Sequence, residues 1–292
     1  MNAACVDLGD YDVLILDGKD AHTFLQGYLT CDVALLGPER ALLGAFCNLQ
    51  GRVVADVVLA SAAGVPWMSI HRSLVAPLQA SLAKYLQFSR SKLRAGGDEL
   101  VTLGLLAGFG DATSTWPAAP FAAIGFRGGV AIRVPGTPPR WLAMLPFDAA
   151  CELWARAADE NRIADAAAWD LSDVRARWAR LGAATSEAFL PQVLGLTELG
   201  GVSFEKGCYL GQEVVARAQH LGRLKRRLAS AHWHGREAPA AGESLLDERD
   251  RAVGTVIVAA HTATAAGEAL VVVGETIADG AHTAPGITFD FP

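Results

Sequence analysis

Residues 200–217 read GGVSFEKGCYLGQEVVAR, and this stretch decides the fold and the chemistry more than any other part of the chain. Glycines at positions 200, 201 and 207 permit tight backbone turns. The residues after Gly207 have helical character through Arg217. The pattern therefore predicts a glycine-rich turn that leads into a helix, with Cys208 in the first turn of that helix.

Cys208 is the candidate reactive residue of this stretch. Lys206 precedes it by two positions, and free backbone N–H groups at a helix start together with a nearby ammonium stabilise a thiolate. An inert buried thiol is the alternative interpretation, because free cysteines are among the most buried residue types. We take Cys208 as a candidate functional thiolate, with Lys206 as its cation. Glu213 and Arg217 have the i,i+4 spacing, acid first, of a surface ion pair.

On the N-terminal side of this stretch, two successive sections alternate strands and helices. The first section has a helix at 20–29 after its first strand and a helix at 73–86 at its end, and apolar runs at 41–48 and 52–60 form a hairpin around Gln50-Gly51. The second section ends in two helices. The expected strands are 11–17 and 65–71 in the first section and 99–107, 121–126, 129–134 and 140–145 in the second, whose helices are 147–160 and 165–182.

On the C-terminal side the pattern changes to short β runs separated by glycine, proline and polar turns, at 224–234, 253–260, 268–274 and 286–290. This order predicts an α+β fold with a small C-terminal β-barrel. The expected domains are 1–95, a first α/β subdomain, 96–222, a second α/β subdomain that carries the KGCYLGQE motif, and 223–292, the barrel.

Composition excludes several classes of protein. Of the 292 residues 51% are hydrophobic and 19% charged, so wholesale disorder is excluded. No uncharged run reaches the roughly 18–20 residues of a membrane-spanning helix. The N-terminal residues show no signal or transit pattern, and the five cysteines form no C-x-x-C pair, so we expect a cytoplasmic protein with reduced thiols and no membrane contact. Hydrolase, NTPase and zincin motifs do not occur in the sequence.

The segment KGCYLGQEVVAR resembles the signature of the YgfZ family, relatives of the folate-dependent aminomethyltransferases of the glycine cleavage system. Further blocks of the family follow in order over nearly the whole chain. They are Gln26-Gly27 with Thr30 and Asp32, Cys47 to Gly51, Phe88-Ser89, Phe189-Leu190-Pro191-Gln192, and Gly200 to Phe204.

The resemblance implies two plaited ferredoxin-like α/β subdomains of the glycine-cleavage T-protein type plus a β-barrel, around a central folate cavity. It implies a protein that binds tetrahydrofolate or a related folate and supports the assembly or repair of iron–sulfur cluster enzymes, including those that thiolate tRNA. Cys208 would carry this accessory role. The expected partners are folate and iron–sulfur client proteins, and the expected state is a monomer without stand-alone enzyme activity.

One position departs from the transferases. Aminomethyltransferases carry adjacent acids after the turn that corresponds to Gly51, and this chain has Ala55-Asp56 there. Since a carboxylate orients the folate nitrogen for one-carbon transfer, the missing acid argues against the alternative of a tetrahydrofolate-dependent aminomethyltransferase.

Two aromatic residues, Tyr11 and Trp169, fall where the family places folate contacts. The expected helix at 165–182 has a buried stripe of Leu171, Val174, Trp178 and Leu181, and Trp169 lies about 200° around the helix from Leu171. A large aromatic off the stripe needs another cover, either a pterin ring or another subdomain.

Basic residues cluster after the motif, at Arg217, Arg223, Lys225, Arg226 and Arg227. With Glu213 beside them, Arg217 and Arg223 are candidates for holding a polyglutamyl folate tail. The cluster also suits RNA phosphates or a solvated strand edge. An RNA-binding tRNA-modification factor is thus a second alternative. The net charge of −6 and the lack of stacking aromatics at 223–227 argue against it. His232 and His234 share a strand face without a third ligand, so no tightly bound metal is expected.

Overall fold

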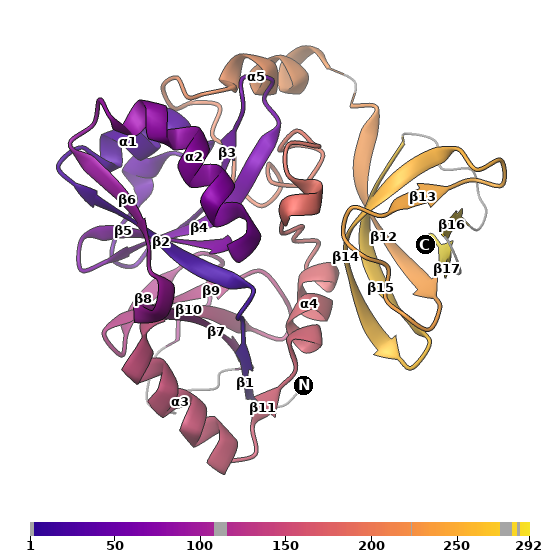
Figure 1. The fold of residues 1–292 in the computed structure, drawn as a ribbon, viewed down its shortest axis with the longest axis horizontal. Helices are drawn as coiled ribbons and strands as arrows, with labels where there is room; N and C mark the ends of the chain where they lie inside the picture. The colour runs from indigo at the N-terminus through magenta and orange to yellow at the C-terminus, as the bar shows by residue number, and fades with distance from the viewer. Residues whose placement is uncertain (1–2, 108–115, 223, 275–281, 285–286) are drawn as a thin grey trace.

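The structure is a computed structural model, and it describes residues 3–107, 116–222, 224–274, 282–284 and 287–292. Its α/β body contains two sheets, and a third, curled sheet from the C-terminal part of the chain stands beside the body (Figure 1). The predicted α+β class is therefore confirmed.

The first sheet has five antiparallel strands in the spatial order β3-β4-β5-β2-β6. Both β3 and β4 are buried over almost their whole length, because helices lie on one face and other parts of the body on the other. Leu78 and Leu82 of the second helix are buried against this sheet. The elements are β2 (Tyr11–Gly18), α1 (Ala21–Tyr28), β3 (Leu42–Cys47), β4 (Val53–Ala62), β5 (Val65–His71), α2 (Val75–Leu86) and β6 (Ser91–Ala95), with short 3-10 turns at Val33–Leu35 and Arg72–Leu74.

The second sheet has six strands in the order β11-β1-β7-β10-β9-β8, and α3 packs on it. Its turn between β8 and β9 lies at Gly128, as the Gly128-Gly129 pair predicts. The elements are β1 (Ala4–Asp7), β7 (Leu100–Leu106), β8 (Ala123–Phe126), β9 (Gly129–Val134), β10 (Arg140–Pro146), α3 (Phe147–Asp159) and β11 (Ile163–Ala164), with a 3-10 turn at Gly97–Glu99.

The N-terminal strand joins the two halves of the body. Although β1 precedes the first sheet in the sequence, it pairs with β7 and β11 of the second. The chain thus crosses between the sheets directly after its first strand. The division at residue 95 stays a prediction, and β1 is the part of 1–95 that lies in the other sheet.

The C-terminal β module is a curled antiparallel sheet in the order β12-β15-β14-β13-β16-β17, with β17 pairing back onto β12. Trp233, Val271 and Phe289 fill its interior. Its strands are β12 (Arg226–His234), β13 (Ser244–Leu246), β14 (Ala252–Ala263), β15 (Ala266–Gly274), β16 (His282–Ala284) and β17 (Ile287–Asp290). None of the helices in the described ranges has the length and apolarity of a membrane-crossing helix.

Helix α4 (Ala166–Arg175) lies between the second sheet and the curled sheet and contacts β14 and β15 (Figure 1). The Asp165 side chain caps it by accepting a hydrogen bond from the Ala167 N–H at 3.2 Å. The predicted helix to residue 182 is too long, because Arg177 has a positive φ of 54° and ends the helical path. The predicted stripe through Trp178 and Leu181 is therefore not a helix face.

Candidate functional site

The motif cysteine lies in a loop and not in a helix. Cys208 is exposed, and α5 (Gln212–Leu221) begins four positions later, so the prediction of a helical first turn at Cys208 is wrong. The cause is Gly211, which has a φ of +84° directly before the helix. A Cβ at Gly211 would lie 2.4 Å from the Asn48 carbonyl oxygen, so only glycine fits this contact with the β3–β4 hairpin.

Lys206 is buried and binds the chain's own backbone. Its ammonium donates to the carbonyl oxygens of Gln26, Leu29 and Cys31 at 2.6, 2.9 and 2.8 Å. Burial lowers the pKa of Lys206. An ammonium has three hydrogens, and all three are used here, so none is left for the Cys208 thiol. The role of Lys206 as the cation of a thiolate stays a prediction; its visible role is to hold the motif on the turn after α1.

The other family blocks meet around the motif. The Thr30 hydroxyl donates to the Gly201 carbonyl at 2.6 Å, and the Gln192 amide donates to the Val215 carbonyl at 2.7 Å. Glu213 and Arg217 form the predicted i,i+4 ion pair at 2.7 Å, and both side chains are exposed. Arg223 lies outside the described residues. Segments far apart in the sequence thus pack together beside the motif that carries Cys208.

Replacing Lys206 with methionine is expected to lower the free energy of unfolding by about 2–4 kcal/mol, because it leaves buried carbonyl groups without donors. Lys92, which is exposed on β6, supplies the matched control: Lys92→Met should change this free energy by less than about 0.5 kcal/mol. Urea unfolding followed by circular dichroism measures both. Equal stabilities of the two variants would contradict a structural role for Lys206.

Tyr11 lies at a cavity between the body and the curled sheet. This cavity has a volume of about 200 Å³, and Tyr11, Asp170, Asp173 and Arg180 line it from the body. Ile257 to Ala259 of β14 close the opposite side. Tyr11 also lines a second cavity of about 490 Å³, together with Phe147 and Trp154 of α3. Tyr11 therefore lines both cavities, and burial raises the pKa of its phenol.

Aromatic rings and guanidinium groups alternate in a buried stack that begins at Tyr11. The Arg180 guanidinium lies 4.5 Å from the Tyr11 ring centroid and 4.7 Å from that of Trp178. Arg140 continues the stack, 5.6 Å from Trp178 and 4.5 Å from Trp169. Such contacts are stronger when they are desolvated. The stack therefore connects both predicted folate aromatics through residues of the chain itself.

Trp169 is covered by protein. Its exposed fraction is 0%, and a Cβ at Gly104 of β7 would lie 2.5 Å from its ring, so the indole packs directly on this strand. Trp169 shares the inward face of α4 with Ser172 and Asp173. The prediction that it lies off the buried face is wrong, because the helix ends before the residues that defined the expected stripe. Trp169 is also not among the residues that line the 200 Å³ cavity.

The charged groups at this cavity are unusually buried. Arg180 is 6% exposed and pairs with Asp56 at 2.9 Å between Nε and Oδ2, yet its Nη1 and Nη2 atoms have no hydrogen-bond partner among the described residues. Arg140 forms a buried ion pair with Asp173. Burial, with repulsion from Asp173 and Asp10, raises the pKa of Asp170 to about 7. The cavity thus offers unused donors beside a carboxyl group that titrates near neutrality.

The sequence interpretation missed Arg140, Asp170, Asp173 and Arg180. Only Arg140 carried a usable signal, because it directly precedes the apolar run WLAML, where a charged side chain needs a partner. Asp170, Asp173 and Arg180 lie in the charged stretch WDLSDVRARWAR, which reads as solvent-exposed. Their partners could not be identified from spacing alone. Conversely, the structure does not bring Glu213 or Arg217 to the Tyr11 cavity, since neither lines it.

Comparisons with known proteins agree with the resemblance. No family model matches the chain. The tRNA-modifying proteins YgfZ of Pectobacterium carotovorum subsp. carotovorum and Escherichia coli O157:H7 are each 32% identical to it, over 266 and 262 residues. These alignments cover 88% and 86% of this chain and 79% of each relative.

Among solved structures, the glycine cleavage system aminomethyltransferase T from Bartonella henselae superposes with a TM-score of 0.75. The superposition covers 99% of this chain and 85% of that chain at 18% identity, which shows the fold alone. The mixed α+β body with its curled C-terminal sheet is thus an aminomethyltransferase-like fold. The identity of 32% over most of both chains shows that this chain belongs to the YgfZ family.

Proposed function

We propose that this protein binds tetrahydrofolate or a related folate in the 200 Å³ cavity beside Tyr11. The observation that carries the proposal is the Arg180 guanidinium, whose buried Nη1 and Nη2 atoms lack partners at the wall of this cavity. Buried donors without partners destabilise a fold unless something satisfies them. A ligand with acceptor atoms at this position supplies what Arg180 lacks.

The chemistry of the lining fits a pterin. A pterin presents a carbonyl oxygen that accepts hydrogen bonds and ring and exocyclic N–H groups that donate, which complements Arg180 and the carboxyl groups of Asp170 and Asp173. Tyr11 supplies an aromatic ring for a flat heterocycle. A cavity of 200 Å³ suits a two-ring head but not a whole folate, so we place the tail toward the 490 Å³ cavity, which Tyr11 also lines. In this arrangement Trp169 does not touch the pterin, and it supports the site through its contact with Arg140, which in turn contacts Trp178.

We further propose that the protein is an accessory factor for iron–sulfur enzymes that modify tRNA, and that Cys208 carries this role. The relatives are tRNA-modifying proteins, which supports the connection to tRNA modification. The exposure of Cys208 supports contact with another protein, because a client can reach its sulfur. When bound, a reduced folate supplies a one-carbon carrier or a reductant.

Aminomethyl transfer is not favoured as the function. The remaining acid of the transferase pair, Asp56, accepts a hydrogen bond from the Leu181 N–H at 2.8 Å with Oδ1 and pairs with Arg180 through Oδ2. Both of its oxygens are therefore engaged by the chain itself. A carboxylate held in this way is a structural partner of Arg180.

Tetrahydrofolate binding is expected to release protons near pH 6–7 and to tighten as the pH rises toward 8. Asp170 has a pKa of about 7, and ligand N–H groups favour its ionised form, so binding lowers that pKa. Because the pKa of Asp170 in the folded state is raised above its ordinary value, the folded protein binds this proton more tightly than the unfolded chain does. The free protein should therefore lose stability as the pH rises from about 4 to about 7. Anaerobic calorimetric titrations in buffers of different ionisation enthalpy measure the released protons.

The Asp170→Asn variant should bind tetrahydrofolate without this pH dependence, and Asp17→Asn, an exposed carboxylate of β2, should behave as wild type. Proton release that persists in Asp170→Asn would contradict the assigned contact. The absence of saturable binding by the wild-type protein would contradict the folate proposal as a whole.

A further inference from the structure

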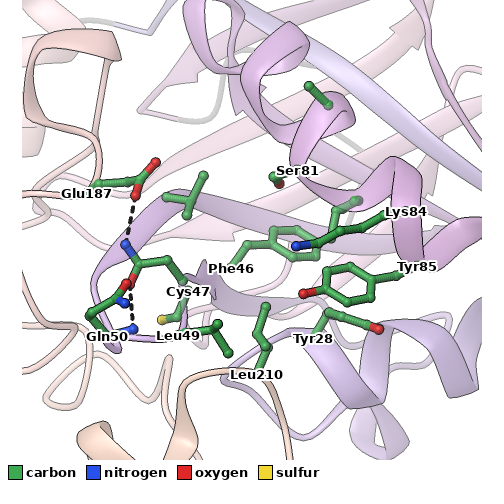
Figure 2. Close-up of a pocket in the computed structure, with 14 residues that line it drawn as sticks. Tyr28, Phe46, Cys47, Leu49, Gln50, Ser81, Lys84, Tyr85, Glu187 and Leu210 are labelled. Atoms are coloured by element: carbon green, nitrogen blue, oxygen red, sulfur yellow. Dashed lines mark hydrogen bonds between the residues drawn. The ribbon is translucent and has the colours of Figure 1, made fainter.

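A third cavity, of about 300 Å³, lies beside the motif loop and away from Tyr11. The tip of the β3–β4 hairpin, α2 and Leu210 of the motif enclose it. Figure 2 shows Tyr28 and Tyr85 at one end, Glu187 at the other, and Cys47 and Leu210 between them. Its volume is at the lower end of the range of small-molecule sites.

Aromatic rings dominate one end of this cavity. Tyr28 stacks on Phe24 with 4.5 Å between ring centroids, and its centroid lies 5.0 Å from that of Tyr85. The Lys84 ammonium lies 4.8 Å from the Tyr85 centroid and is exposed on a flexible stem. Lys84 therefore covers a ring face that it can leave without breaking a buried contact.

The opposite end is polar and fixed in place. Glu187 accepts a hydrogen bond from the Asn48 amide through Oε2 at 2.7 Å, which leaves Oε1 for another donor. The Asn48 side chain in turn accepts from the N–H groups of Gln50 and Arg52 at 3.0 Å and shapes the hairpin tip. Burial raises the pKa of Cys47 to about 12, so its thiol is a neutral part of the floor.

Positive charge lies across the hairpin tip from the tyrosines. Gln50 lines both this cavity and a neighbouring one of about 600 Å³, which Arg52, Lys225 and Arg226 also line. Lys225 and Arg226 are exposed, and no carboxylate contacts them within the described part of the chain. Glu187, held by Asn48, is the one acid among the described residues that line either cavity. Basic residues thus gather on this face of a protein whose net charge is −6.

We propose that this face binds single-stranded RNA, with one unstacked base in the tyrosine-lined cavity and the neighbouring phosphates on Lys84, Lys225 and Arg226. Single-strand sites combine aromatic stacking with a positive path for the backbone, and both occur here on either side of the hairpin tip. The free Oε1 of Glu187 accepts a hydrogen bond from a base amino group. An apolar peptide side chain would fill the cavity but leave the basic residues without a function.

This site is distinct from the Tyr11 cavity and does not depend on folate. It also supplies the stacking aromatics that the sequence lacks at 223–227, because Tyr28 and Tyr85 come from the first sheet's helices and reach the basic cluster only in the folded protein. The direct consequence is that the protein itself touches RNA beside Cys208.

Fluorescence anisotropy of a labelled ten-nucleotide single-stranded RNA, measured on the full chain without folate, tests the proposal. Tyr85→Ala should weaken binding roughly ten- to hundredfold through lost stacking, while Tyr85→Phe should bind as wild type. Lys225→Ala should reduce the slope of log affinity against log salt by about 0.7, the value for one phosphate contact on a single strand. The same sequence as a duplex should bind more weakly, because its bases are stacked.

Two matched variants keep the outcome interpretable. Phe88→Ala removes an aromatic ring that is 86% exposed two residues after α2 and does not line the cavity. Arg236→Ala removes an exposed charge two residues after β12 of the C-terminal sheet. Both should bind RNA as wild type. Equal RNA affinity of the wild type and Tyr85→Ala would overturn the proposal. Equal affinities are also the result expected if the cavity binds a protein side chain instead of a base. Unchanged tetrahydrofolate binding by Tyr85→Ala separates this result from any failure of the folate cavity.

Discussion

Replacing Arg140 with methionine is expected to lower the free energy of unfolding by about 3–5 kcal/mol, because it leaves the Asp173 carboxylate buried without its cation. Arg140 and Asp173 are 1% and 2% exposed, so water cannot take the place of the missing partner. The change also removes the Arg140 hydrogen bond to the Pro135 carbonyl at 2.7 Å and the contact with the Trp169 ring. Denaturant unfolding at pH 7 measures the loss.

The double variant Arg140→Met, Asp173→Leu should recover much of this stability, since replacing both members of a buried pair by apolar residues is often nearly neutral. Arg175→Met is the matched control. Arg175 pairs with Glu268 at 2.7 Å but is 51% exposed, so its removal should cost about 1 kcal/mol or less. A double variant no more stable than Arg140→Met would show that the unpaired charge is not the cause of the loss.

Replacing Cys208 with serine is expected to abolish the proposed accessory activity while leaving the fold intact. Cys208 is exposed in a loop, and exposed substitutions usually change stability by no more than about 0.5 kcal/mol. The melting temperature and tetrahydrofolate affinity should therefore match wild type. Complementation of a bacterial strain that lacks its YgfZ protein, read out as the level of thiolated tRNA, measures the activity.

Cys151, on α3, is the other exposed cysteine in the described part of the chain and serves as the control for thiol labelling. Cys151 lines the 490 Å³ cavity that we assign to the folate tail, so complementation is compared between the wild type and Cys208→Ser. Burial raises the pKa values of Cys5, Cys31 and Cys47 to about 12, so iodoacetamide at neutral pH should label only Cys151 and Cys208. Full complementation by Cys208→Ser would contradict a functional role for the motif thiol.

Local sequence was sufficient for elements whose pattern and packing agree. The apolar runs of β3, β4 and β10 were predicted within one or two residues, as was α3. The start of α5 could not be predicted in this way, because it depends on Gly211 meeting the Asn48 carbonyl of a distant hairpin. The end of α4 was also missed, because Arg177 has a positive φ despite the helical pattern, and its guanidinium donates to the distant Leu228 carbonyl at 2.9 Å.

The two candidate sites differ in the same way in how far the sequence predicts them. The motif around Cys208 is contiguous and was found directly, whereas the Tyr11 cavity is built from partners that only the fold brings together. Arg180 meets Asp56 of β4 and Tyr11 of β2, and neither contact leaves a periodic trace in the sequence. Trp169 was singled out because it was expected to lie off the buried face, which is wrong; Gly104 and Arg140 cover it inside the protein.

A crystal structure of the protein with tetrahydrofolate, grown anaerobically at a saturating concentration, tests the central proposal most directly. We expect electron density for the pterin in the 200 Å³ cavity, with its acceptor atoms on the Arg180 Nη1 and Nη2 atoms and its ring beside Tyr11. Density for the folate at another position, or an empty cavity with Arg180 still unpaired, would contradict it.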